Sequence, residues 1–372
     1  MSIEIKQVKS RRELKKFIYL PARIHRDHPN WVPPIYMDEW KNFNPKKCRA
    51  FSYCDATLVL AYRNGKVVGK IMGVINHRYN NSRQEKTGRF AYLECWDDQE
   101  VAHALLGFVE NWAKQRGMNK LIGPFGFPYQ LSEGFLIEGF EHRATIATYH
   151  NFEYMIRLLR NEGYTKDVDY VVYKVNIPKE IPEIYKKIHQ RVTKKGEFKL
   201  IEFTKRSQLK PYIRPIFRLE NECFNGLYGF VPLDEQEMDD LGKRYLLLFD
   251  PRFVKIVTKN DEVVAFALGI PDMSEGIQKA KGHILPFGIF KILRAAKETK
   301  QLDLLLGAIK EEYRGRGLDV MVVVKIIESA KQAGFEYMDS HHELETNTKM
   351  RAEMERLGGY VYKRFRIFKK LL

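Results

Sequence analysis

Apolar residues in the first half of the chain recur with the period of a helix between residues 101 and 113. Four large apolar side chains share one helical face there: Val101, Leu105, Phe108 and Trp112. Asp98 can cap the start of this helix and Gly117 can end it. Near the end of the second half, the run AKQAG at residues 330–334 matches AKQRG at residues 113–117. We therefore predict two helices in corresponding places, each followed by a strand.

Alternating apolar and polar residues predict a hairpin earlier in each half. The turns fall at Asn64-Gly65 and at Asn260-Asp261. Each half then reads strand, helix, strand, helix, strand, and a proline-containing segment joins the two halves. The repeat predicts an α+β fold of two similar units in tandem, each a mixed central sheet flanked by helices. We place the boundary near residue 176, which gives domains 1–176 and 177–372.

Two segments depart from the repeat. Residues 78–88 are polar, and we interpret them as a loop. Residues 282–300 combine apolar and basic side chains around Pro286 and Gly288. A helix from about Ile289 would place apolar and cationic residues on separate faces, as helices on membrane surfaces do. The alternative is a helix that packs between the hairpin and the next strand.

The composition is that of a folded protein, with 44% hydrophobic and 30% charged residues. The N-terminus lacks a secretory signal, and no run approaches the ~18 apolar residues of a membrane span. We expect a cytoplasmic location and no stable membrane association. The four cysteines form no CxxC pair and no Cys/His cluster, so we expect no metal site. The net charge of +16 would attract phosphates on a nucleotide, a nucleic acid or a membrane.

A glycine- and arginine-rich run, EEYRGRGLDV at residues 311–320, follows a predicted strand and opens a helix. Gly315 and Gly317 can adopt backbone angles closed to other residues, which lets an anion approach the N–H groups of a helix start. Arg314 and Arg316 add positive charge and forked donors. The run predicts a phosphate-binding turn, and an ordinary basic turn is the alternative.

This run, with the hairpin before it and the runs ETN and MERLGGY after it, resembles the GNAT superfamily of acyl-CoA-dependent N-acyltransferases. The resemblance covers the whole second half. It implies acetyl-CoA or another acyl-CoA as co-substrate, with the pantetheine arm along the strand that ends at Ile309 and with Asn347 facing the cofactor. The diphosphate of coenzyme A would lie against Arg314, Gly315, Arg316, Gly317 and Leu318.

The sequence departs from the family pattern in four places. Asp319 stands where the pattern has Gly or Ala, and its carboxylate would repel a diphosphate. The strand before the motif has no central glutamate to act as a base, and Met354 occupies the position of the usual acidic tyrosine. The corresponding junction of the first half has no glycine or arginine but carries acidic residues, so this unit is a degenerate repeat: Asp97, Asp98 and Glu100.

Substitute catalytic groups are available in the segment 335–347. Strand alternation would place five polar residues on one face: Tyr337, Asp339, His341, Glu343 and Glu345. Histidines and carboxylates at a strand end can relay a proton. We predict Glu345 and His341 as candidate bases and Tyr360 as the proton donor to the departing thiolate. For each of them, a solvated ion pair is the alternative.

Together these features predict an N-acyltransferase that moves an acyl group from acyl-CoA to an amine bound between the halves. The acceptor would be a small molecule or a peptide. Two alternatives stay open: a Fem-type transferase that uses aminoacyl-tRNA, and a non-catalytic binding protein with the same fold. A nucleic-acid partner belongs only to the first alternative, and we do not expect one under the leading interpretation.

Overall fold

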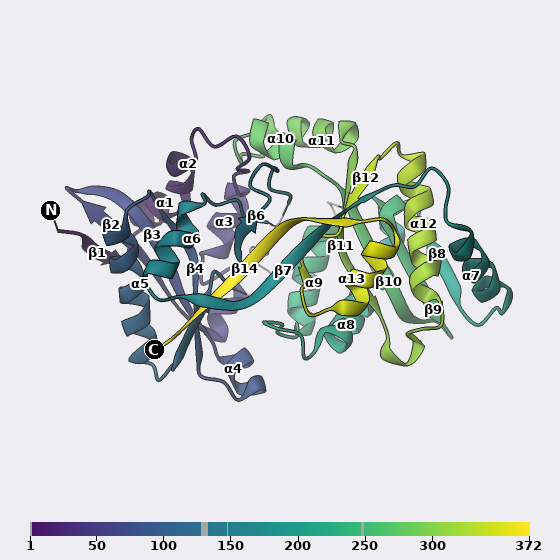
Figure 1. The fold of residues 1–372 in the computed structure, drawn as a ribbon, viewed down its shortest axis with the longest axis horizontal. Helices are drawn as coiled ribbons and strands as arrows, with labels where there is room; N and C mark the ends of the chain where they lie inside the picture. Colours follow the sequence, from purple (N-terminus) through teal and green to yellow (C-terminus); the bar gives the residue numbers. More distant parts are fainter. Residues whose placement is uncertain (1, 128–132, 147, 247–248) are drawn as a thin grey trace.

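One mixed β-sheet runs through the whole protein, with helices against both of its faces (Figure 1). This computed structural model describes the chain except residues 1, 128–132, 147 and 247–248, and it leaves out the side chains of residues 244 and 245. Within the described residues the strand order is β1-β2-β3-β4-β5-β14-β7-β12-β11-β10-β9-β8, with β6 beside β14 and β13 beside β7.

The first half forms the predicted hairpin and helices. Asn64-Gly65 joins the two hairpin strands, and Asp98 caps the predicted helix by accepting from the Val101 N–H at 3.2 Å. The elements are β1 (Glu4–Gln7), α1 (Arg11–Tyr19), α2 (Pro21–Ile24), α3 (Tyr36–Asn42), η1 (Arg49–Ser52), β2 (Cys54–Arg63), β3 (Lys66–Asn76), α4 (His77–Arg83), β4 (Thr87–Cys95), α5 (Gln99–Lys114), β5 (Lys120–Gly123), β6 (Phe135–Glu138), α6 (Tyr154–Asn161) and β7 (Thr165–Asn176).

The second half repeats this order with additional helices. Asn260 and Asp261 both have positive φ in the turn of its hairpin. The elements are α7 (Glu183–Lys194), β8 (Lys199–Glu202), η2 (Arg206–Tyr212), α8 (Ile213–Phe224), α9 (Glu235–Leu246), η3 (Pro251–Phe253), β9 (Val254–Lys259), β10 (Glu262–Pro271), α10 (Ser274–Lys279), α11 (Gly288–Glu298), β11 (Gln301–Ile309), η4 (Glu311–Tyr313), α12 (Leu318–Gln332), β12 (Tyr337–Asp339), β13 (Glu343–Leu344), α13 (Thr348–Arg356) and β14 (Tyr360–Leu371).

The two halves exchange their last strands. β14, the final strand of the second half, pairs with β5 of the first half, and β7 pairs with β12 of the second half. β7 and β14 also pair with each other, and they cross the centre of the molecule together (Figure 1). The predicted boundary near residue 176 falls at the end of β7, and the sheet runs across it.

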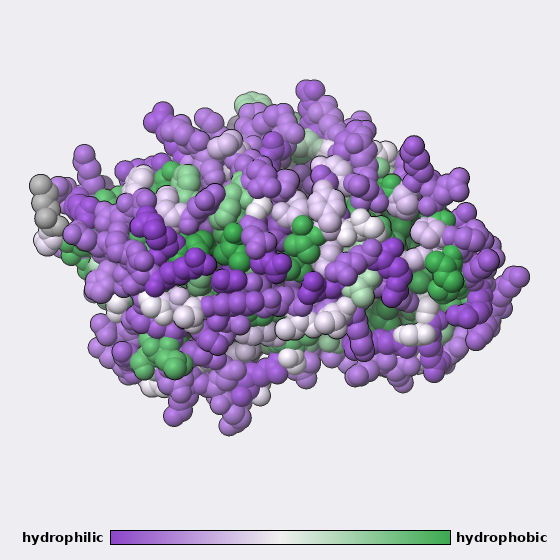
Figure 2. Space-filling model, in the orientation of Figure 1, coloured by the Kyte–Doolittle hydropathy of each residue, from purple (hydrophilic) through white to green (hydrophobic). Residues whose placement is uncertain are grey.

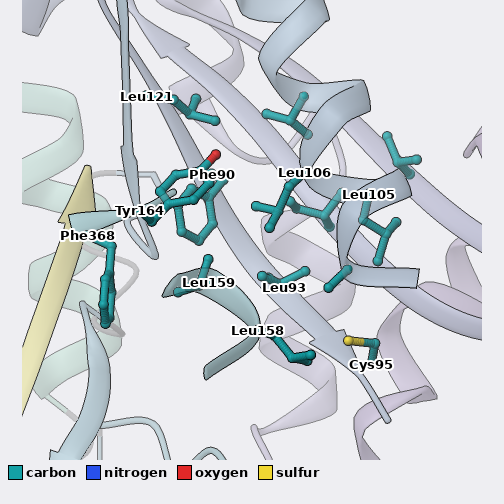
Figure 3. Packing of buried hydrophobic residues seen from close by; sticks show 14 of the residues in the cluster. Phe90, Leu93, Cys95, Leu105, Leu106, Leu121, Leu158, Leu159, Tyr164 and Phe368 are labelled. Carbon is teal, nitrogen blue, oxygen red and sulfur yellow. The ribbon is translucent and has the colours of Figure 1, made fainter. Parts of the chain in front are cut away.

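The exchange places a C-terminal side chain in the core of the first half. Phe368 of β14 is 1% exposed and packs in the cluster formed around α5 and α6. Figure 3 shows Phe368 on the side of the cluster occupied by Tyr164 and Leu159. The first half therefore completes its core with a residue from the last strand of the chain.

Replacement of Phe368 with Ala is expected to lower the free energy of unfolding by about 3–5 kcal/mol, because it removes buried surface and leaves a cavity. Urea denaturation followed by circular dichroism would measure this change. Leu371→Ala, at an end of the same strand where the side chain is 78% exposed, should change stability by less than about 0.5 kcal/mol. Equal effects of the two substitutions would contradict this account of the core.

The interpretation of residues 78–88 as a loop was wrong for its first part, which forms α4. Asn76 caps this helix by accepting from the Tyr79 N–H at 3.0 Å. Arg78 of α4 pairs with Glu237 at 2.9 Å and with Asp234 at 3.1 Å, both from the second half. A polar segment thus becomes a helix because distant carboxylates hold it.

The surface is strongly polar. Figure 2 shows hydrophilic residues over most of one face, with hydrophobic residues in separate patches between them. Within the described residues, none of the helices combines the length and the apolar character needed to cross a membrane.

Candidate functional site

The turn after β11 leaves open space above the start of a long helix. Gly315 and Gly317 have φ values of +73° and +88°, in the region that favours glycine. No side chain caps the N-terminus of α12, so the first N–H groups of the helix lack an intrahelical partner. A Cβ at Gly315 would meet no atom within 4 Å. The backbone of this turn is therefore accessible to an anion.

The side chains of the turn have separate roles. Leu318 is fully buried and anchors α12 in the core of the second half. Arg314 donates from Nε to the Ile309 carbonyl oxygen at 3.2 Å, and Arg316 donates from Nη1 to Glu197 at 3.0 Å. Both arginines are exposed, so an incoming phosphate could compete for their remaining N–H groups.

Asp319, the departure from the family pattern, lies beside an acidic residue of α13. Burial first, and Asp319 in addition, raise the pKa of Glu353 above its usual value. Tyr185 of α7 donates to the same Glu353 carboxyl at 3.0 Å. Asp319 of α12 therefore interacts with Glu353 of α13.

The strand that ends at Ile309 has one open edge. β11 pairs with β10 as far as Ile309, but it pairs with β12 only over residues 301–303. The register with β10 skips Leu305, which marks a bulge just beyond the point where β11 and β12 diverge. Bulges of this kind are common next to active sites. In the described part of the chain, no strand pairs with this edge of β11 from residue 304 onward, so an extended ligand could pair there.

Two predicted ligand-binding residues already have partners within the protein. The Ile309 carbonyl oxygen accepts from Arg314 and lies 3.4 Å from the thiol of Cys223. Asn347 caps α13, where its side-chain oxygen accepts from the Met350 N–H at 3.4 Å.

A pair of buried aspartates lies where β11 and β12 diverge. Asp303 of β11 is directly opposite Asp339 of β12, and the two are 0% and 1% exposed. Gln301 donates to Oδ1 of Asp303 at 2.6 Å, whereas Oδ2 of Asp303 has no hydrogen-bond partner. Asp339 accepts from the His341 N–H at 2.6 Å and from the hydroxyl of Tyr362 on β14.

Burial and nearby charges shift the pKa values of Asp303, Lys363 and Tyr362. Burial first, and then the charges of Asp272 and Asp339, raise the pKa of Asp303 well above its ordinary value. Burial lowers the pKa of Lys363, although the three aspartates oppose that shift. Burial and Asp339 raise the pKa of Tyr362. A buried carboxyl with a raised pKa and an unpartnered oxygen can exchange a proton with a bound ligand.

The structure separates the three catalytic residues predicted from the sequence. His341 has a φ of +59°, so the expected strand alternation breaks between β12 and β13. His341 is partly buried, its ring stacks on that of His342 with centroids 5.1 Å apart, and burial lowers its pKa. Glu345 pairs with Lys166 at 2.7 Å and accepts from the Asp169 N–H.

Tyr360 does not approach Glu345. It lies opposite Lys174 on β7, whereas the Glu345 N–H donates to the carbonyl of Asp169. Asp169 and Lys174 are five residues apart along the strand, a distance of about 17 Å. Tyr360 is also 53% exposed. Glu345 and Tyr360 therefore belong to different parts of the β7 surface.

Asp303 is the residue that sequence reasoning missed. It is the one carboxylate in the otherwise apolar strand LDLLLGAI, and that isolation was the available signal. The family resemblance points instead to a glutamate in the middle of the strand, where this sequence has none. A second buried carboxyl lies on α8, where burial raises the pKa of Glu220 to about 8 and Oε2 has no partner.

Two hollows of the surface are lined by residues other than the aspartate pair. One of about 290 Å³ opens at Lys210, Arg214, Asp239 and Lys243, and a smaller apolar one of about 40 Å³ adjoins it beneath α8 and α9. We place the site by the open edge and the buried carboxyls instead, because these groups supply the chemistry. In the part of the chain that the structure describes, no group of His, Cys, Asp and Glu side chains is arranged to hold a metal ion.

Two curated proteins are similar to this chain over nearly their full length. Bacterial ceramide synthase of Caulobacter vibrioides is 28% identical over 372 residues, which is 98% of this chain and 96% of that protein. Protein YghO of Escherichia coli K12 is 26% identical over 370 residues, which is 97% of this chain and 93% of that protein. No protein-family profile matches the sequence.

Solved structures share the fold. A tandem GNAT protein from the clavulanic acid biosynthesis pathway matches this chain with a TM-score of 0.56 and 11% identity. The match covers 100% of this chain and 98% of that protein's chain. A GCN5-related N-acetyltransferase from Sphaerobacter thermophilus matches 99% and 95%, with a TM-score of 0.51 and 13% identity. The predicted fold, two tandem GNAT-like units with a mixed sheet flanked by helices, is confirmed.

Proposed function

We propose that this chain, which has the tandem GNAT fold, is an N-acyltransferase that moves an acyl group from acyl-CoA to the amine of a long-chain amino alcohol. The observation that carries the proposal is Asp303, a buried carboxyl with a raised pKa and an unpartnered oxygen, on the strand that leads to the glycine turn. One strand thus joins a proton acceptor to an anion-binding turn.

The donor would lie along β11. Its diphosphate would occupy the turn 314–318, where the space above Gly315 is open and the helix start is uncapped. Its pantetheine arm would pair with the open edge at residues 304–309. This direction brings the thioester to the bulge at Leu305, two residues from Asp303.

Asp303 would then serve as the base. The amine nitrogen attacks the thioester carbonyl carbon, the C–S bond breaks, and an amide forms. The proton lost by the amine passes to the Asp303 carboxylate and from there to the departing thiolate, which leaves as a thiol. A raised pKa suits this role, because it brings the proton affinity of a carboxylate closer to that of its reaction partners.

The acceptor class rests on the similarity to bacterial ceramide synthase, since a ceramide is the amide of a long-chain amino alcohol. Purified protein would be incubated with acetyl-CoA or palmitoyl-CoA and with sphinganine, ethanolamine or a lysine peptide, and free thiol would be measured. We expect thiol release with sphinganine. Release only with another amine would correct the acceptor. No release with any amine would contradict the proposal, and amide formation from aminoacyl-tRNA alone would support the Fem-type alternative.

A further inference from the structure

The segment between β10 and β11 presents a cluster of apolar side chains to solvent. Eleven large hydrophobic residues are exposed among those described, and four of them fall within nine consecutive residues. These four define the α11 patch: Leu285 (73% exposed), Phe287 (72%), Phe290 (66%) and Leu293 (54%). The other seven are spread along the rest of the sequence. An exposed apolar cluster of this kind is typical of an interaction site.

Residues 272–300, which include α10 and α11, form a tightly packed platform that holds the α11 patch outward. Ile292 of α11 is buried against α10, where a Cβ at Gly276 would lie only 2.6 Å from its Cα. The turn before α11 is equally tight, because a Cβ at Gly288 would lie 1.7 Å from the His283 carbonyl oxygen. α10 and α11 form an outer layer along the upper edge of the molecule in Figure 1. The helix therefore buries one apolar face and exposes a second.

Cationic residues surround the α11 patch. Residues 279–300 contain six lysines and arginines against one acidic residue, Glu298, which gives a net charge of +5. Exposed cations flank the patch on the helix and on the turn before it: Lys281, Lys291, Arg294 and Lys297. Exposed aromatic and leucine side chains beside lysine and arginine fit the boundary between the acyl chains and the headgroups of an anionic bilayer.

The position of the platform relates it to the aspartate pair. Its first residue, Asp272, contributes to the raised pKa of Asp303, and its last residue precedes Gln301, the hydrogen-bond partner of Asp303. A surface bound through the α11 patch would therefore face the end of β11 that holds Asp303, opposite to the glycine turn.

We propose that the α11 patch docks this protein onto the surface of an anionic lipid bilayer. The docking is peripheral, with Phe287 and Phe290 inserted among the acyl chains and the cations at the headgroups. This docking differs from the expectation of no stable membrane association, and it follows the membrane-surface alternative that the sequence offers for the helix near Ile289. The inference does not depend on the proposed function, because it requires no catalysis.

Co-sedimentation of the full-length protein with vesicles tests this docking. Wild-type protein should bind vesicles of phosphatidylcholine mixed with phosphatidylglycerol, and should bind much less to phosphatidylcholine alone or at high salt. Phe287→Ser/Phe290→Ser should lower the apparent binding constant by at least about tenfold. Lys291→Gln/Lys297→Gln should weaken binding to anionic vesicles while leaving the weak binding to phosphatidylcholine unchanged.

A matched control separates this patch from general surface hydrophobicity. Ile184→Ser removes a side chain that is 58% exposed on α7, outside the α11 patch, and should leave vesicle binding unchanged. Unfolding curves should be the same for all variants, since each altered side chain is exposed. Absence of wild-type binding, or equal binding by the phenylalanine double variant, would overturn the proposal. A dimer that dissociates in the double variant without vesicle binding would instead identify the patch as an interface between copies.

Discussion

Replacing Asp303 with Asn is expected to lower kcat/KM for acyl transfer by about 10²–10⁴-fold, the usual contribution of a positioned general base. The amide keeps the size of the carboxyl and can still accept from Gln301, but it cannot take up a proton. Free-thiol release with a saturating donor and varied amine would measure the change. Binding of coenzyme A should be unaffected, because Asp303 lies at the other end of β11 from the glycine turn.

Stability distinguishes a lost base from a damaged fold. The pKa of Asp303 is raised in the folded state, so its contribution to stability is fully present below the unfolded pKa and is lost as pH rises through the folded pKa. The asparagine of Asp303→Asn does not ionise, so the variant keeps this stability as the pH rises. We expect the variant to match the wild type in acid and to unfold at a higher temperature than the wild type at alkaline pH.

The pH dependence of the reaction gives a further check. Wild-type kcat/KM should fall as the pH drops through the raised pKa of Asp303, and the variant should lose this dependence. Glu220→Gln is the matched comparison, because Glu220 is also a buried carboxyl with an unpartnered oxygen. If Glu220→Gln loses activity and Asp303→Asn keeps it, the base lies on α8 and our assignment is wrong.

Replacing Gly315 with Trp is expected to raise the Kd for coenzyme A by about 100-fold. The indole would fill the open space above the turn and displace the diphosphate, whose two or more charge-assisted hydrogen bonds contribute roughly 1.5–3 kcal/mol each. Isothermal titration calorimetry with coenzyme A would measure the loss. Gly317 is a poorer choice, since a Cβ there would meet Ile188 at 2.8 Å and Val192 at 2.9 Å and would disturb the packing of α7.

The matched control for this substitution is Gly65→Trp. Gly65 has a φ of +72°, almost that of Gly315, and a Cβ there would likewise meet no atom within 4 Å. Backbone strain should lower the free energy of unfolding of both variants by about 1–2 kcal/mol. Only Gly315→Trp should lose the binding of coenzyme A. Unchanged binding by Gly315→Trp would remove the diphosphate from this turn, whatever the activity of the protein proves to be.

Local chemistry in the sequence was enough to predict the fold and the repeated order of its helices and strands. Asp98 is a helix cap, and Asn64-Gly65 is a hairpin turn, because each acts on backbone within a few residues of itself. Gly315 and Gly317 were recognisable for the same reason, since positive φ is a property of single residues. The α+β repeat followed from the order of such local signals.

The candidate base depended on register between distant strands. Asp303 and Asp339 lie far apart in the chain, and only the pairing of β11 with β12 brings them together. The left-handed conformation of His341 broke the alternation that had grouped it with Glu345, and Lys166 of the first half then paired with Glu345. A strand-end pattern could not foresee either event, because both arise from contacts with other strands.

By itself the sequence determined the hairpin turns, the capped helices and the glycine turns of the repeat, since these follow from backbone preferences and capping within short stretches. Only the tertiary structure decided that the halves exchange β7 and β14. It also decided that Asp303, the one aspartate in an apolar strand, is buried. It also decided that α11 buries one apolar face and leaves another exposed. The physical reason is that burial and strand pairing belong to the assembled chain, so the raised pKa of Asp303 and the exposure of Phe287 and Phe290 exist only there.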